Sequence, residues 1–283
     1  MSDTTADALL RASPLPALEA RVLLMHVLGW RRTQLITRGD EALDAAPVAA
    51  YRALEARRAA GEPIAQLVGA REFFGLDFEV TPDVLIPRPE TELLVETALA
   101  ALEGVARPRV LDLGTGSGAI AVAIAAARPD ARVWAVDRSE AALAVAARNA
   151  QKLLDARRPG GAPTFVAGSW YEALASLDEA PRFDAIVSNP PYIASGDPHL
   201  QQGDLRFEPR GALTDEADGL DALRTIVAGA HAHLVPGGVL WMEHGYDQAA
   251  AVRALLEGAG FAQVRSARDL AGIERISGGC WAG

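Results

Sequence analysis

Cysteine and lysine are almost missing from this chain of 283 residues, which contains one of each, Cys280 and Lys152. A single cysteine cannot form an internal disulfide, and no cysteine and histidine residues have the spacing of a zinc site. We therefore predict no metal site and a reducing compartment, the cytoplasm.

Long apolar segments are also absent. The longest purely apolar run, Ala119 to Ala127, is rich in alanine and far shorter than the roughly 20 residues that a membrane-spanning helix needs. The N-terminal stretch MSDTTADALL is acidic and lacks the apolar core of a signal peptide. The sequence therefore predicts a soluble protein that does not bind membranes.

Positive charge is scarce as well. Lysine and arginine number 27 against 37 aspartates and glutamates, which gives a formal net charge of −10. Tight binding to a nucleic-acid backbone usually requires a basic surface, so we expect no direct nucleic-acid partner. The first 75 residues are balanced in charge, and the excess of acid lies downstream. That neutral, arginine-bearing segment could dock onto an anionic partner or simply be a solvated helical surface.

Residues 1–67 show helical periodicity and no strand signal. Leu15, Leu18, Val22 and Met25 form an apolar stripe at helical spacing, which predicts that this side of a helix faces a core. We interpret the segment as a small helical bundle.

Residues 68–89 change to an aromatic, β-rich composition with turn residues such as Gly75, which predicts a β-hairpin linker. From residue 90 to residue 283, short apolar strands alternate with helices. This alternation is typical of a parallel sheet with helices on both faces, and we expect seven strands. The fold class is therefore α/β, a Rossmann-like domain preceded by a helical domain.

A glycine-rich loop follows the first strand of the α/β part. In VLDLGTGSGAIA, Gly114, Gly116 and Gly118 lie between strand and helix, where glycine lets the backbone approach a ligand. Asp137 ends the next strand, where a carboxylate can accept both hydroxyls of a ribose. The loop also fits a dinucleotide-binding pattern, so a dehydrogenase is an alternative. Asp112, just before the loop, instead favours a cationic or amino-bearing ligand.

A rigid corner follows the fourth strand, residues 183–187. Asn189 there carries a side-chain acceptor, and the carbonyl of Pro190 is turned outward because another proline follows it. Two fixed acceptors can hold a planar NH₂ group, and Tyr192 can cover its flat face. Orienting such a weak nucleophile against a methyl sulfonium gains from proximity, and the acceptors stabilise positive charge that develops on nitrogen.

Four motifs together resemble one family. VLDLGTGSGAIA, AVDRS, NPPYI and LIPRPETE look like the HemK/PrmC family of peptide-chain release factor glutamine methyltransferases, and the resemblance covers nearly the whole chain. NPPY alone is shared with enzymes that methylate amino groups of DNA and RNA, and IPRPETE with REFFG before it is more selective. The family's fold is a class I methyltransferase domain behind a helical domain.

The resemblance implies roles by position. S-adenosyl-L-methionine would be bound by Asp112, Gly114, Thr115, Gly116, Ser117, Gly118, Asp137, Trp170 and Asn189. Catalysis would involve Asn189, Pro190 and Tyr192, and with Pro191 these residues would form the pocket for a glutamine. Ser169 departs from the family, in which an acidic residue is frequent before the tryptophan.

The substrate implied is the glutamine of the Gly-Gly-Gln loop in class 1 release factors, with residues 1–67 recognising the release factor. Alternatives are a ribosomal-protein glutamine, the exocyclic amine of adenine or cytosine in nucleic acid, and an inactive module that only binds release factors. An intact loop and Asn189 argue against the inactive module. We expect a monomer. Taken singly, Arg210 and Glu243 are interpreted as members of structural ion pairs, and His244 as a hydrogen-bonded residue at a strand end.

Overall fold

The computed structural model describes residues 4–177 and 181–283. Two compact units divide the chain. The helical unit comprises Met1–Ala70 together with Gln201–Phe207, and the sheet unit comprises Arg71–Leu200 and Glu208–Gly283. Residues 1–3, the beginning of the predicted helical domain, and residues 178–180, inside the predicted methyltransferase domain, lie outside the described residues.

The described residues of the helical unit form five α-helices, namely α1 (Ala6–Ala12), α2 (Ala17–Leu28), α3 (Arg32–Thr37), α4 (Ala45–Ala59) and α5 (Ile64–Val68). Its core contains the fully buried side chains of Leu23, Leu24 and Tyr51. Leu15 and Met25 of the predicted apolar stripe pack against this core, whereas Leu18 is 72% exposed, so the prediction was right for only part of the stripe. Apolar residues surround most of α2, and spacing alone could not identify the side that packs.

The segment Gln201–Phe207, which includes the 3₁₀-helix η4 (Gly203–Phe207), belongs to the helical unit although it is distant in sequence. Arg58 Nη1 donates to Asp204 Oδ1 at 3.1 Å. Gln66 Nε2 donates to the carbonyl of Phe207 at 3.1 Å. The chain therefore leaves the sheet unit after Leu200 and returns to it at Glu208, an excursion that the sequence pattern did not indicate.

Strands β1 (Ala70–Phe73) and β2 (Leu76–Glu79) form a two-stranded sheet. The two residues between them, Phe74 and Gly75, both have positive φ, 51° and 75°, as a type I′ hairpin turn requires. Phe78 is fully buried in the core cluster that also contains residues of helix α7 (Ala119–Ala127). The hairpin thus packs onto the sheet unit.

The described residues of the sheet unit form a seven-stranded sheet in the order β5-β4-β3-β6-β7-β9-β8. The strands are β3 (Arg109–Leu113), β4 (Arg132–Asp137), β5 (Thr164–Ala167), β6 (Phe183–Ser188), β7 (Leu234–Glu243), β8 (Ala262–Arg268) and β9 (Glu274–Cys280). The first five strands in the order are parallel, and β9 is antiparallel to both neighbours. The predicted class I methyltransferase fold is confirmed.

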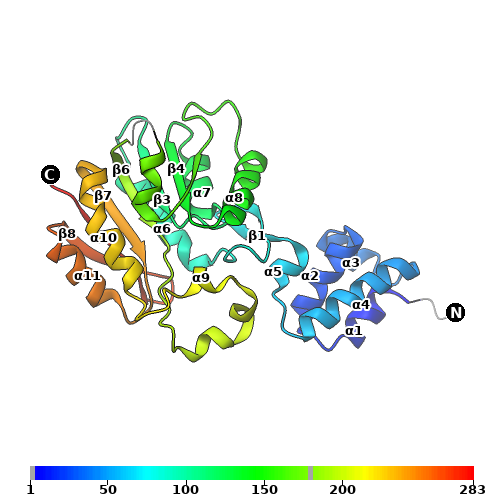
Figure 1. The fold of residues 1–283 in the computed structure, drawn as a ribbon. Helices are drawn as coiled ribbons and strands as arrows, with labels where there is room; N and C mark the ends of the chain where they lie inside the picture. Colours follow the sequence, from blue (N-terminus) through cyan, green and yellow to red (C-terminus); the bar gives the residue numbers. More distant parts are fainter. Residues whose placement is uncertain (1–3, 178–180) are drawn as a thin grey trace. The chain divides into compact units, whose positions relative to one another are not determined.

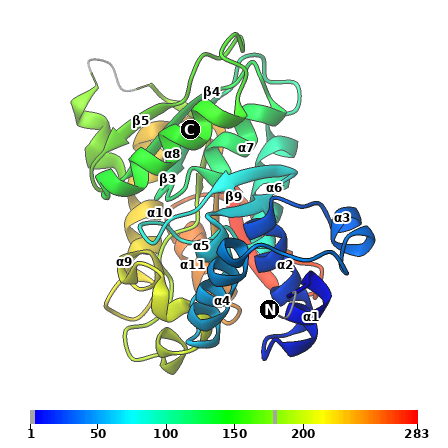
Figure 2. The same ribbon diagram turned by 90° about the vertical axis from the view of Figure 1, so that its right-hand side faces the viewer.

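Helices cover both faces of this sheet, as Figures 1 and 2 show. One core cluster joins the sheet to α6 (Glu92–Ala101), α7 (Ala119–Ala127) and α8 (Glu140–Leu153). The other joins it to the 3₁₀-helix η2 (Trp170–Ser176), α10 (Asp221–His233) and α11 (Ala249–Gly258). Shorter elements are the 3₁₀-helices η1 (Pro89–Thr91) and η3 (Pro198–Gln201) and helix α9 (Arg210–Leu213). In the described chain, no helix is both long and apolar enough to span a membrane.

The central strands β3 and β6 set the place of the site. They are neighbours, with Leu113 paired to Ser188, so their carboxyl ends lie at the same level. The chain continues from β3 toward β4 on one side and from β6 toward β7 on the other. Such a switch point opens a crevice at the carboxyl edge of an α/β sheet, where ligands bind. The glycine loop and Asn189 both begin there.

Candidate active site

The glycine loop after β3 has the backbone that its sequence requires. Gly114, Gly116 and Gly118 have φ values of 75°, 54° and 79°, a left-handed conformation that side chains disfavour. At Gly118, which caps α7, an added Cβ would also lie 3.0 Å from the Cβ of Ala146. The tight approach of loop and α8 therefore requires glycine at this position.

Asp137 joins the end of β4 to this loop. Its Oδ2 accepts from the backbone N–H of Gly116 at 2.8 Å, and its Oδ1 accepts from the N–H of Ser139 at 2.9 Å. An ionised carboxylate offers about four acceptor positions, so both oxygens can still accept a hydroxyl. Asp137 lines the cavity described below, and the predicted ribose contact fits this geometry.

A cavity of about 310 Å³ opens at the carboxyl edge of the sheet. Six of the predicted site residues line it together: Gly114, Gly116, Asp137, Trp170, Asn189 and Pro191. Ser169 lines it too, as do two stretches whose part in the cavity the sequence did not reveal, 83–85 after the hairpin and 209–212 around α9. Residues from six segments of the sheet unit thus converge on one hollow.

Other predicted cofactor residues lie behind the cavity wall. Asp112, Thr115 and Ser117 are buried, and like Gly118 they do not line the cavity. Thr115 Oγ1 donates to Asp112 Oδ2 at 2.6 Å, whereas Asp112 Oδ1 has no hydrogen-bond partner among the described residues. Burial raises the pKa of Asp112 to about 7, against the hydrogen bond from Thr115, which lowers it. Their contact with a cofactor stays a prediction.

Trp170 forms part of the cavity wall and has a strained backbone. Its φ is 45°, which is uncommon for a residue with a large side chain. A Cβ built on Gly114 would lie 3.5 Å from the indole ring, so ring and glycine loop are adjacent. The indole offers a flat apolar surface on which an adenine ring could pack.

The Asn-Pro-Pro-Tyr corner begins where β6 ends. Ser188 Oγ donates to the carbonyl of Leu113 at 2.6 Å, which holds β6 against β3 directly below the corner. Asn189 faces the cavity, and its Nδ2 donates to Thr91 Oγ1 at 3.2 Å. Pro190 is buried and does not line the cavity, and no hydrogen bond to its carbonyl comes from the described part of the chain.

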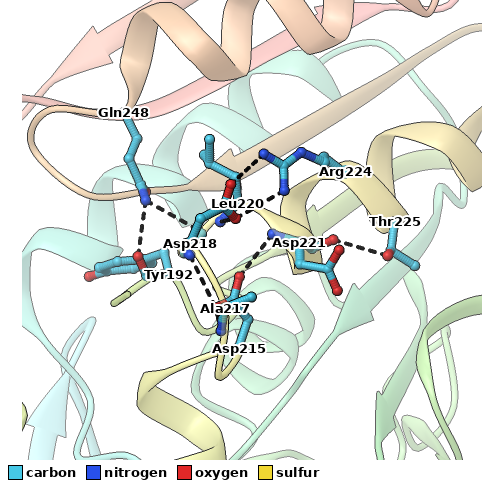
Figure 3. Close-up of polar contacts among 10 residues, drawn as sticks. Tyr192, Asp215, Ala217, Asp218, Leu220, Asp221, Arg224, Thr225 and Gln248 are labelled. Atoms are coloured by element: carbon cyan, nitrogen blue, oxygen red, sulfur yellow. Dashed lines mark hydrogen bonds and ion pairs between the residues drawn. The ribbon is translucent and has the colours of Figure 1, made fainter. Parts of the chain in front are cut away.

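Tyr192 is held at both ends. Its hydroxyl donates to Glu243 Oε1 at 3.1 Å, and its carbonyl accepts from Gln248 Nε2 at 3.0 Å. Gln248 also donates to the carbonyl of Gly219 at 3.1 Å, and Figure 3 shows this amide bridging the two segments. A Cβ at Gly219 would lie 2.4 Å from the Tyr192 carbonyl, so glycine is required there. The side chain of Tyr192 does not line the cavity, and its predicted contact with an amine stays a prediction.

Asp215 shapes the loop that passes under the corner. Its carboxylate accepts from the N–H groups of Ala217 at 2.9 Å, Gly219 at 3.0 Å and Asp221 at 2.8 Å (Figure 3). These bonds fold the loop tightly before α10 begins. The loop thereby presents the carbonyl of Gly219 to Gln248.

The motif IPRPETE, far from the corner in sequence, is brought to the site by Glu208. This buried carboxylate accepts from the N–H of Ile86 at 2.8 Å and forms an ion pair with Arg88. Arg210, two residues later, pairs with Glu216 at 2.5 Å, as interpreted from the sequence. Residues before α6 and residues around α9 are thus joined beside the cavity.

Glu243 and His244 end strand β7. Both ring nitrogens of His244 have partners, with Nε2 2.7 Å from Ser277 Oγ and Nδ1 2.9 Å from the carbonyl of Gly245, which confirms the interpretation of a satisfied histidine. Glu243, interpreted from the sequence as part of an ion pair, instead accepts hydrogen bonds from Tyr192 and Thr91. Among residues 4–177 and 181–283, no group of three or more His, Cys, Asp and Glu residues is arranged to hold a metal ion.

Comparison with known proteins gives matches over both units. Residues 4–69 match the model described as the PrmC N-terminal domain, and residues 89–203 match the methyltransferase small domain. Two solved structures share the fold. The hMettl16 catalytic domain in complex with a 3′UTR hairpin has a TM-score of 0.57, with 18% identity and 81% of each chain covered. A 16S rRNA N2 methyltransferase (RsmC) of T. Thermophilus, in complex with AdoMet and guanosine, has a TM-score of 0.50, with 25% identity over 75% of this chain and 49% of that chain.

A curated relative is similar along its whole length. The release factor glutamine methyltransferase of Burkholderia pseudomallei (strain K96243) is 72% identical over 278 residues, which cover 98% of this chain and 96% of that protein. With its methyltransferase fold, its cavity and this relative, the chain belongs to the release factor glutamine methyltransferase family.

Proposed function

We propose that this protein transfers a methyl group from S-adenosyl-L-methionine to the side-chain amide nitrogen of the glutamine in the Gly-Gly-Gln motif of class 1 release factors. One observation carries the proposal: Asn189 of the corner faces the same cavity as Gly114, Gly116 and Asp137. A glutamine amide at Asn189 therefore lies next to whatever the glycine loop binds.

The residues present fit the cofactor. Asp137 retains acceptor positions for the ribose hydroxyls, Trp170 offers a flat surface for adenine, and the glycine loop brings backbone close to the ligand. When bound, S-adenosylmethionine supplies an electrophilic methyl group on a sulfonium.

The corner prepares the nitrogen that is methylated. In this proposal, the Oδ1 of Asn189, a residue that lines the cavity, accepts one N–H group of the glutamine amide. The carbonyl of Pro190, behind the cavity wall and without a hydrogen bond from the described residues, accepts the other, which directs the nitrogen toward the methyl group. Fixing this geometry replaces a bimolecular encounter with an oriented one. The same acceptors stabilise the positive charge that develops on nitrogen. The surplus proton leaves to water after transfer, so the scheme uses no side-chain base.

The partner and setting follow from the same assignment. We infer that the partner is a class 1 release factor, bound with help from the helical unit, and that the enzyme works as a monomer in the cytoplasm. A nucleic-acid amine would fit the same corner, and the hMettl16 neighbour is in complex with an RNA hairpin. The formal net charge of −10 favours a protein substrate.

The test is mass spectrometry of a purified class 1 release factor after incubation with the enzyme and S-adenosylmethionine. We expect one added methyl group, located on the Gly-Gly-Gln glutamine, and none with Asn189→Ala. The variant should remain folded because Asn189 lies at a corner outside the core. An unmodified release factor, with cofactor binding shown by calorimetry, would refute the substrate and direct the search to ribosomal proteins and nucleic acid.

A further inference from the structure

A buried set of hydrogen bonds lies behind the Asn-Pro-Pro-Tyr corner. Asn189 Nδ2 donates to Thr91 Oγ1 at 3.2 Å, and Thr91 Oγ1 donates to Glu243 Oε2 at 2.7 Å. The other oxygen of Glu243 accepts from the Tyr192 hydroxyl at 3.1 Å. Thr91 is 4% exposed and Glu243 is 2% exposed. One carboxylate thus connects to both polar side chains of the corner.

The direction of these bonds decides how the amide of Asn189 lies. A carboxylate only accepts, so the single O–H of Thr91 points at Glu243 and its lone pairs are left for an N–H donor. The NH₂ of Asn189 satisfies that requirement. If the amide were reversed, its oxygen would face an oxygen that has no hydrogen to offer. Glu243 therefore determines, through Thr91, that Oδ1 of Asn189 is turned away from Thr91.

The surroundings of Glu243 are those of a buried acceptor. Burial raises the pKa of Glu243, and Glu90 of η1 raises it further. The hydrogen bonds from Thr91 and Tyr192 and the positive charge of Arg275 in β9 lower it. Burial likewise raises the pKa of the Tyr192 hydroxyl, with Glu243 adding to the effect, so this hydroxyl stays a donor. Leaving such a group without partners is costly, which is why both hydrogen bonds hold firmly.

We propose that Glu243, acting through Thr91, is a positioning residue that holds the Asn189 oxygen toward the glutamine amide and anchors the ring of Tyr192. This rests on the proposed function, and it assigns a role to the threonine of IPRPETE and to the end of β7. Gln248 donates to the backbone carbonyl of Tyr192, so both the side chain and the backbone of Tyr192 are held in place.

The experiment compares Thr91→Val with Thr91→Ser in the full-length enzyme. Valine keeps the volume and removes the hydroxyl, and serine restores it. For Thr91→Val we expect kcat on a release factor to fall about 10- to 100-fold, as for a misplaced catalytic group, with the Kd of S-adenosylmethionine within about twofold. Thr91→Ser should recover kcat to within about threefold of the parent. Equal kcat in Thr91→Val and the parent would overturn the proposal.

A matched control is Tyr171→Phe, which removes another hydroxyl, one that donates to the carbonyl of Ile226 in α10 at 2.9 Å and contacts neither Thr91 nor Glu243. We expect its kcat within about twofold of the parent. A loss as large as that of Thr91→Val would show a general effect of buried hydroxyls and refute a specific role. Glu243→Gln should lower kcat as well, because one of the two acceptor oxygens becomes a donor. In the parent we expect kcat to fall as the pH is lowered and Glu243 becomes protonated, because burial raises the pKa of this carboxyl, and this fall should be absent in Glu243→Gln.

A second readout does not depend on activity. The side-chain NH₂ signal of Asn189, assigned by its loss in Asn189→Ala, should be protected from solvent exchange in the parent and exposed in Thr91→Val. If the parent methylates no release factor but this protection is lost in the variant, the proposed substrate fails and the positioning role stands. If methylation proceeds and protection is the same in both, the positioning role fails.

Discussion

Several single residues support the site without lining its cavity. Asp112 was expected from the sequence to face an amino-bearing ligand, and the structure buries it completely beneath the glycine loop with Thr115 as partner. A motif identifies the residue type that a position uses, but it does not tell whether the side chain points to the ligand or supports the loop. Glu243 illustrates the same limit, because its partners Thr91 and Tyr192 are 152 and 51 positions away in sequence.

Asp112 should make stability depend on pH. Burial raises its pKa from 3.8 to about 7 on folding, so the native state binds more protons than the unfolded state between these values. The resulting stabilisation is fully present below pH 3.8 and is lost as pH rises through about 7. Relative to Asp112→Asn, the free energy of unfolding of the parent should fall by about 2–3 kcal/mol between pH 5 and pH 8. Urea unfolding at both pH values measures this, and a constant difference would show an ordinary carboxyl group.

Whole elements were predicted more successfully than their contacts. The alternation of strands and helices from residue 90 onward predicted the α/β sheet because a strand buried on both faces and an amphipathic helix leave distinct patterns. The sequence did not reveal that the hairpin packs on α8. Asn149 makes that connection: its side chain exchanges hydrogen bonds with the backbone of Glu79, at 2.7 Å and 3.1 Å, and donates to the carbonyl of Ser117 at 2.9 Å.

Asn149→Ala should therefore destabilise the hairpin and the glycine loop together. It leaves the backbone groups of Glu79 and Ser117 without partners, and we expect a loss of about 2–4 kcal/mol in the free energy of unfolding. Arg148→Ala is the matched control, since the neighbouring side chain is 49% exposed and pairs with Glu79 only at the surface. It should cost about 1 kcal/mol or less. Similar losses in the two variants, measured by urea unfolding, would disprove the bridging role of Asn149.

At the scale of the whole molecule, amino-acid composition excluded some classes of protein but did not identify a function. The scarcity of cysteine, lysine and long apolar runs argued against a disulfide-bonded, a nucleic-acid-binding or a membrane-spanning protein. Four motifs pointed to one family, and the relatives confirm that family. The excursion of Gln201–Phe207 into the helical unit could not be foreseen, because it depends on long-range contacts such as that between Arg58 and Asp204. The predicted role of residues 1–67 in recognising the release factor stays a prediction.

Removal of residues 1–70 tests that role. We expect the Kd of S-adenosylmethionine to change by less than about threefold, because the residues that line the cavity all lie in the sheet unit. Methylation of a folded release factor should fall at least about tenfold, the loss of roughly 1.4 kcal/mol of recognition. A short peptide that contains Gly-Gly-Gln is the control substrate, and its rate should change less. If both rates fall equally, the deletion has damaged the catalytic site and the recognition role is not supported.

The excursion of the chain also affects which gene segments can be exchanged between relatives. Arg58 and Gln66 of the helical unit meet Asp204 and Phe207, which are encoded more than a hundred codons later. A gene chimera that exchanged only the first 70 codons between two distant relatives would place a foreign helical surface against a resident segment 201–207. We expect such hybrids to misfold more often than hybrids that exchange both stretches. The two pieces of sequence therefore have to be exchanged together.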